Sequence, residues 1–247
     1  RRISYVAGGI AHCVLGGIGA ALYLQRARGW DALDPIYGAL VAALAAAVVI
    51  GLVSLKARQR VDTVIGAVWA IGMATGILFL SRTPGYGEDL MSYLFGNILM
   101  VTGRDLWLMV ALDVVVVAAA LLFFKQLQSI CFDEEFSRVR GLNVSLYFVF
   151  LLVLTALTIV LLVTVVGIVM VIALLTIPAA VAGHFTNRLS HMMAAAVIVS
   201  IVFTTGGLAV SYGPNLPAGA TVIVFAGATY LLVATATAVR RRRRKSA

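Results

Sequence analysis

Eight apolar stretches, each about as long as a membrane-spanning helix, constrain this chain more than any other feature. A helix needs roughly 20 apolar residues to cross the hydrocarbon core of a bilayer. Hydrophobic residues make up 62% of the sequence and charged residues only 12%, a balance that no soluble domain of this size needs. The expected spans are 4–25, 36–55, 63–81, 106–124, 144–163, 164–183, 192–211 and 219–239. We therefore predict an all-α, polytopic helical bundle of about eight transmembrane helices that forms one domain over residues 1–247.

The boundary between the fifth and sixth spans is the least marked. Residues 147–183 form one continuous apolar stretch, which is too long for a single span and must turn. We predict the turn near Val163–Gly167, although the residues before it carry no charge and only one polar side chain.

Positive charge is distributed unequally between the two sides that these spans define. If the first arginines are cytoplasmic, 15 of the 19 lysines and arginines fall on the cytoplasmic side. The positive-inside rule therefore places both chain ends in the cytoplasm. We interpret the basic run at 240–245 as an anchor near anionic membrane lipid, and we expect no nucleic acid partner because no accompanying fold is visible.

One ionisable side chain, His12, is expected at membrane depth within the first span. Gly8, His12 and Gly16 are spaced four residues apart, so they share one face of a helix. The glycines leave the imidazole in a groove that is open to a neighbouring helix or to a passing ion. Because an ionisable group inside the bilayer is costly, His12 is the leading candidate for a functional side chain. A histidine that bonds a neighbouring helix for packing is the alternative.

Two further residues could line an ion pathway. Cys13 points about 100° away from His12 around the helix, so packing is favoured over ligation for its thiol. Asp113 lies inside the fourth span, where a structural hydrogen bond suits it as well as contact with an ion. Cys131 is the second of two cysteines and falls in a cytoplasmic segment, so we predict no disulfide.

The external connection after the third span has a pattern of its own. Glu88 and Asp89 precede an apolar run that ends at Gly96. Acids at the start of an apolar segment favour a short amphipathic or re-entrant helix at the outer face.

The cytoplasmic connection at residues 131–142 also predicts a short helix. Asp133 is placed to cap it, acidic residues come early, basic residues come late, and Gly141 can end it. A short helix is marginal on its own, so we expect a partner to pack on it. A solvated linker is the alternative.

No catalytic motif is visible in the chain. It has no Gly-x-x-x-x-Gly-Lys-Ser/Thr loop, no His-Glu-x-x-His and no Gly-x-Ser-x-Gly. We therefore predict that it is not an enzyme, holds no catalytic residues, and does not itself hydrolyse ATP.

The chain resembles the ABC-type zinc, manganese and iron permease family, the membrane subunits of bacterial metal importers. Four segments carry this resemblance and occur in the family's order: Arg-Ile-Ser-Tyr with Gly-Gly-Ile-Ala-His at 2–12, Asp-Leu-Met-Ser-Tyr-Leu-Phe-Gly-Asn-Ile-Leu at 89–99, Val-Val-Gly-Ile with Ala-Leu-Leu-Thr-Ile-Pro-Ala-Ala at 165–180, and Gly-Leu with Leu-Pro-Ala-Gly-Ala at 207–220. Many members carry an aspartate where this chain has Gly8. His12 alone cannot supply a closed metal site.

The resemblance implies partners. An ABC ATPase subunit would hydrolyse ATP, an extracytoplasmic metal-binding protein would deliver the ion, and a second copy of the permease would complete a homodimeric pathway, with His12 facing the space between the copies. No cofactor would be bound permanently, because the zinc, manganese or iron ion is the cargo. The resemblance further implies the bacterial inner membrane, a cytoplasmic C-terminus, and one more helix upstream of residue 1.

The resemblance also gives roles to the two patterned connections. Residues 131–142 would be the coupling helix that docks on the ATPase, through Phe132, Glu135, Phe136, Arg138 and Gly141. The external segment would form a docking surface or gate, through Asp89, Tyr93 and Phe95.

The resulting prediction is the transmembrane permease of an ABC importer that moves a divalent metal ion into the cytoplasm by alternating access. The main alternative is an ATP-independent secondary metal-cation transporter or channel, which would carry more charges within its spans. A permease for a vitamin or siderophore is a second alternative, which would need a wider cavity and no ion-selective histidine.

Overall fold

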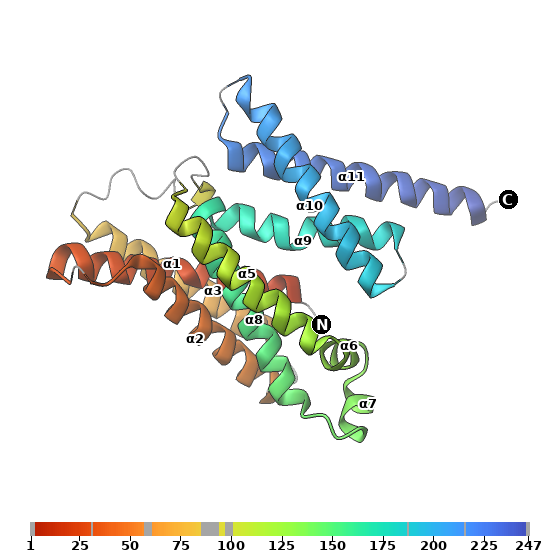
Figure 1. Ribbon diagram of the computed structural model, residues 1–247, viewed down its shortest axis with the longest axis horizontal. Helices are drawn as coiled ribbons and strands as arrows, with labels where there is room; N and C mark the ends of the chain where they lie inside the picture. The colour runs from red at the N-terminus through yellow and green to blue at the C-terminus, as the bar shows by residue number, and fades with distance from the viewer. Residues whose placement is uncertain are drawn as a thin grey trace.

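All the regular structure in the described part of the chain is α-helical (Figure 1). The computed structural model describes residues 3–30, 32–56, 61–84, 94–96, 101–186, 188–214 and 216–245. Its helices are α1 (Ile3–Arg28), α2 (Pro35–Lys56), α3 (Val61–Ser81), α5 (Gly103–Leu122), α6 (Phe124–Phe132), α7 (Glu134–Val139), α8 (Val144–Val166), α9 (Ile168–Phe185), α10 (Leu189–Tyr212) and α11 (Ala218–Lys245). The prediction of an all-α bundle is confirmed.

The number of long apolar helices agrees with a polytopic membrane protein. Seven helices in the described residues are long and apolar enough to span a bilayer, and α5 with α6 makes an eighth if that pair, bent by 67°, is one span. Large apolar side chains stand exposed on their outer faces, such as Trp107 on α5, Ile198 on α10 and Leu232 on α11. Lipid can cover such faces, because the membrane interior is as apolar as they are.

Helix α1 lies at the centre of the larger packing unit. It packs against α2, α3, α8 and α9, and Ile10, Val14 and Ile18 on it are almost completely buried. Figure 1 shows α1, α2, α3, α5 and α8 gathered on one side, with α9, α10 and α11 on the other. The second group has a small core of its own around Phe203 and Ala226.

Glycines set the close approach of α1 and α3. A methyl group added at Gly16 would lie 2.8 Å from the carbonyl oxygen of Gly72, and one added at Gly76 would lie 2.7 Å from the backbone of Leu15. Both distances are shorter than ordinary van der Waals contact, so the two backbones touch where side chains would keep them apart.

The turn between α8 and α9 falls at Gly167, within the predicted interval. The predicted boundary between the spans, after residue 163, lies three residues too early, because α8 continues to Val166. Nothing in the apolar side chains marks the end of α8, whereas Gly167 adopts a φ of +78° that other residues resist. The backbone of Phe95 and Gly96 packs directly against this glycine, so the segment predicted to be external meets the α8–α9 turn.

The connection predicted to be cytoplasmic contains two short helices rather than one. The expected helix over 131–142 is observed only as Glu134–Val139, because Cys131 and Phe132 complete α6. Asp133 separates the two helices: its backbone is extended, and its carboxylate accepts a hydrogen bond from the Phe136 amide at 3.0 Å. This confirms the predicted N-cap. The Ser129 and Ser137 hydroxyls, 2.7 Å apart, join α6 to α7.

Candidate functional site

His12 lies on α1, and α3 covers the face that it shares with two glycines. The position of a methyl group on Gly8 is 4.0 Å from the Trp69 ring, and Gly16 contacts the backbone of Gly72. The neighbouring helix expected at the glycine-lined groove is therefore α3.

The indole of Trp69 stacks on the imidazole of His12. The ring centroids are 4.4 Å apart and the ring planes differ by only 10°. Tyr5 packs against the same indole, with its ring centroid 6.3 Å away and its plane tilted by 56°. Tyr5, His12 and Trp69 thus form an aromatic cluster between α1 and α3.

Trp69 is the site residue that the sequence interpretation missed. A signal was available, because Trp69 sits between Gly66 and Gly72, each one helical turn away. A large ring between two small residues fits against a close neighbouring helix. Only the pairing of α3 with α1, which a single sequence does not reveal, identifies His12 as its contact.

The imidazole of His12 has one nitrogen with no protein partner. Its Nδ1 atom is buried and makes no hydrogen bond within the described residues, while the side chain as a whole is half-buried. A buried polar atom without a partner costs about 1–3 kcal/mol. A neutral imidazole also carries a lone pair that can bind a divalent metal ion. Because Nδ1 itself is buried, an ion could reach only the part of the imidazole that stays exposed.

A complete metal site is not assembled by the described residues of one chain. No group of three or more histidine, cysteine, aspartate or glutamate side chains comes together among them. An ion that contacts His12 would therefore not be enclosed by three or more such side chains from the described part of the chain.

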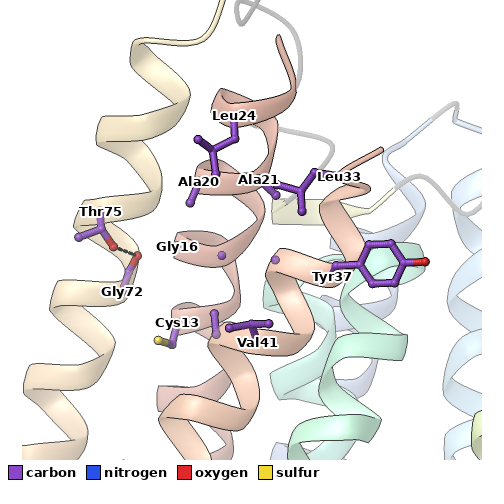
Figure 2. A pocket seen from close by; sticks show the side chains of 13 residues that line it. Cys13, Gly16, Ala20, Ala21, Leu24, Leu33, Tyr37, Val41, Gly72 and Thr75 are labelled. Atoms are coloured by element: carbon purple, nitrogen blue, oxygen red, sulfur yellow. Dashed lines mark hydrogen bonds between the residues drawn. The ribbon is translucent and has the colours of Figure 1, made fainter. Parts of the chain in front are cut away.

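Cys13 faces the α1–α3 contact and an apolar cavity. A methyl group added at Gly72 would lie 2.9 Å from its Sγ atom. The cavity, of about 410 Å³, opens between α1, α2 and α3 and is lined mostly by small and apolar residues (Figure 2). On its α3 wall the Thr75 hydroxyl donates a hydrogen bond to the Gly72 carbonyl at 2.9 Å (Figure 2). These contacts agree with the packing role favoured for Cys13, and His12 is not among the lining residues.

Asp113 lies exposed on α5, a helix that packs against α6 and α8. The structure does not bring it into a cluster with His12 and another ligand side chain among the described residues. A place in the ion pathway stays a prediction for this residue.

The predicted coupling residues form an exposed apolar and charged surface. Phe132 at the end of α6 is 75% exposed and Phe136 on α7 is 53% exposed. Arg140 places its guanidinium 5.2 Å from the centre of the Phe136 ring. Glu135 and Arg138 are also exposed, and Gly141 follows α7 with a φ of +81°. Two exposed phenylalanines form a surface that a partner protein could cover.

The predicted external gate is only partly visible. Asp89 and Tyr93 lie outside the described residues, whereas Phe95 lies in the described segment 94–96 and is half-buried. The carbonyl group of Phe95 packs against Gly219 at the start of α11. The segment therefore bridges the α8–α9 turn and α11, at the end of the bundle that the charge pattern predicts to be external.

Comparison with known proteins identifies the family. The model of the ABC 3 transport family matches residues 1–237. The chain is 42% identical over 232 residues to a membrane protein of Synechocystis sp., covering 94% of this chain and 80% of that one. It is 33% identical to the manganese transport system membrane protein MntC of Listeria monocytogenes, covering 92% and 78%.

A solved structure shows the same fold. PsaBC from Streptococcus pneumoniae, in complex with Fab, superposes with a TM-score of 0.81 at 30% identity, covering 94% of this chain and 81% of that chain. The likeness extends over nearly all of the described helices and confirms the resemblance first noted in four sequence segments. This chain therefore belongs to the ABC 3 transport family, as a multi-pass membrane permease subunit of the ABC type.

Proposed function

We propose that this chain forms the path by which an ABC importer moves a divalent metal ion into the cytoplasm, and that His12 contacts the ion on its way. The observation that carries the proposal is the half-buried imidazole within a helix that is long and apolar enough to span a bilayer. Ionisable groups at such depth are rare and mark ion pathways. The manganese transport named for the Listeria relative supports the same class of cargo.

The proposal does not distinguish between zinc, manganese and iron(II) as the transported ion. Imidazole suits zinc and iron, whereas manganese prefers oxygen ligands such as water, so one histidine in an incomplete ligand set does not identify the ion. A small number of protein ligands suits transport, because an ion that is held by many strong ligands leaves slowly. The ion is cargo, and the proposal includes no permanently bound cofactor.

The proposal includes three protein partners. An ATPase subunit would dock on the exposed surface of Phe132 and Phe136, a metal-binding protein would dock at the external segment 88–99, and a second copy of the permease would complete the pathway. The chain itself would hydrolyse no ATP. We further propose that it lies in the bacterial inner membrane with the arginine-rich end of α11 in the cytoplasm, where anionic lipid attracts it.

Uptake by the reconstituted transporter tests the proposal against its rival. The permease, ATPase and metal-binding protein are placed in liposomes, and entry of radioactive manganese and zinc is measured with ATP, without ATP, and with a non-hydrolysable ATP analogue. We expect uptake only with hydrolysable ATP. Uptake at the same rate without ATP, driven by an ion gradient, would instead identify a secondary transporter or channel.

Two variants, compared in the same uptake assay, test the role of His12. His12→Ala should abolish uptake, whereas Cys13→Ala, at the neighbouring position on α1, should transport at close to the normal rate. Equal loss in both variants would mean that the packing of α1 rather than the imidazole is required.

A further inference from the structure

We infer that Trp69 is a positioning residue for the metal contact: its indole fixes the plane of the His12 imidazole in place of the hydrogen-bond acceptor that usually does so. The inference rests on the proposed role of His12 and adds a residue on α3 to it. The stack with Trp69, 4.4 Å between centroids and 10° between planes, carries it.

A histidine that binds a metal is normally held by a second interaction. Its other ring nitrogen almost always donates a hydrogen bond to a carboxylate, a carbonyl or a water molecule, which sets the orientation of the ring. The Nδ1 atom of His12 is buried and has no such partner in the described residues. The second torsion of a histidine side chain is soft, so the ring needs another restraint to point one nitrogen in a constant direction.

The parallel stack supplies that restraint. Rotation of the imidazole about its side-chain bond would drive a ring edge into the indole face. The indole cannot yield easily, because Tyr5 packs against it from α1 and Gly72 holds α3 against the backbone of Cys13. Trp69 therefore holds the imidazole through shape and ring contact, without a hydrogen bond.

Support by an aromatic stack rather than by a hydrogen bond affects how tightly His12 would bind a metal ion. A hydrogen bond from the second nitrogen raises the basicity of the first and strengthens its bond to a metal. An aromatic stack orients the ring without that strengthening. His12 can thus meet an ion in a constant geometry and still release it, which is what a transport site requires. Loss of a hydrogen-bonding partner that orients a metal ligand costs about 10- to 100-fold in affinity or activity, and we expect loss of the stack to have an effect on that scale.

The first test measures the kinetics of manganese uptake by the reconstituted transporter carrying Trp69 variants. Trp69→Leu should raise the KM for manganese by about 10- to 100-fold and change the maximal rate much less. Trp69→Phe keeps a ring that can stack, so it should restore most of the loss. Trp107→Leu, at an exposed tryptophan of α5, is the matched control and should transport normally. Equal KM values for Trp69→Leu and Trp69→Phe would overturn the inference.

The second test uses the fluorescence of Trp69 and does not depend on transport. Only three tryptophans are present, and Trp30 and Trp107 are both largely exposed, so both can be replaced by phenylalanine to leave Trp69 alone. A paramagnetic manganese ion at His12 should then quench the remaining emission in a saturable way. His12→Ala in the same background should remove the saturable quenching. Quenching that is identical in both proteins would contradict the inference.

The outcomes separate this inference from the function on which it rests. If His12→Ala transports manganese normally, the proposed metal contact is wrong and Trp69 has nothing to position. If His12→Ala loses uptake while Trp69→Leu keeps its normal KM, the metal contact stands and the positioning role is wrong.

Discussion

The close contact of α1 and α3 leads to a prediction about Gly72, where one added methyl group should separate two helices. That methyl group would lie 2.6 Å from the Cα atom of Cys13, a backbone atom that cannot rotate away. Ordinary carbon contacts are about 3.5–4.0 Å, so the helices must move apart by about 1 Å. Overpacking of this kind costs about 1–3 kcal/mol. The movement should also loosen the stack of Trp69, one turn earlier on α3, on His12.

Gly66→Ala is the matched control on the same helix. Its added methyl group would lie 3.5 Å from the Tyr5 hydroxyl, an ordinary contact. Both variants replace a helical glycine by alanine and so gain the same roughly 1 kcal/mol of helix propensity. The difference between their free energies of unfolding therefore isolates the steric cost at Gly72.

The comparison is made by equilibrium unfolding in mixed micelles with increasing sodium dodecyl sulfate, followed by circular dichroism. We expect Gly72→Ala to be less stable than Gly66→Ala by about 1–3 kcal/mol. Equal stability of the two variants would refute the reasoning, because it would mean that α1 and α3 do not meet through backbone contact at this position.

Three further predictions concern the two ends of the bundle. Phe136→Ala should uncouple ATP hydrolysis from uptake in the assembled transporter while Val139→Ala, at another exposed position of α7, should not; normal coupling in Phe136→Ala would remove this residue from the docking surface. Cysteine introduced at Tyr93 should react with an impermeant thiol reagent from outside the cell, and less when the metal-binding protein is docked, whereas labelling only from the cytoplasmic side would reverse the topology. Gly167→Ala should destabilise the chain by at least about 1 kcal/mol in micelle unfolding, because an L residue resists a φ of +78° and its methyl group would meet the backbone of Phe95; unchanged stability would contradict the observed turn.

The sequence predicts those parts of the fold that depend on local chemistry. Long apolar runs define the spans because the bilayer demands them, and Asp133 defines a helix start because its carboxylate can satisfy a free amide. Gly167 lies within the predicted turn, but the end of α8 is displaced because the residues before it carry no polar signal. The break between α6 and α7 was missed, since apolar Phe132 continues the earlier helix as readily as it begins a new one.

The sequence predicts only the part of the candidate site that lies on α1. The spacing of Gly8, His12 and Gly16 identifies a histidine against a close neighbour, and α3 is that neighbour. Which side chain meets the imidazole depends on the pairing of α1 with α3 and on their relative height in the membrane. Both are properties of tertiary packing, and so Trp69 appears only in the structure.

The most direct test of the central claim is manganese uptake by His12→Leu at limiting metal, in liposomes that hold the complete transporter. Leucine fills a similar volume and removes both ring nitrogens, so the variant should assemble with its partners and hydrolyse ATP while importing no manganese. Assembly is checked by co-purification of the ATPase subunit. Uptake at the normal rate by the assembled His12→Leu transporter would contradict the claim and would assign His12 to helix packing.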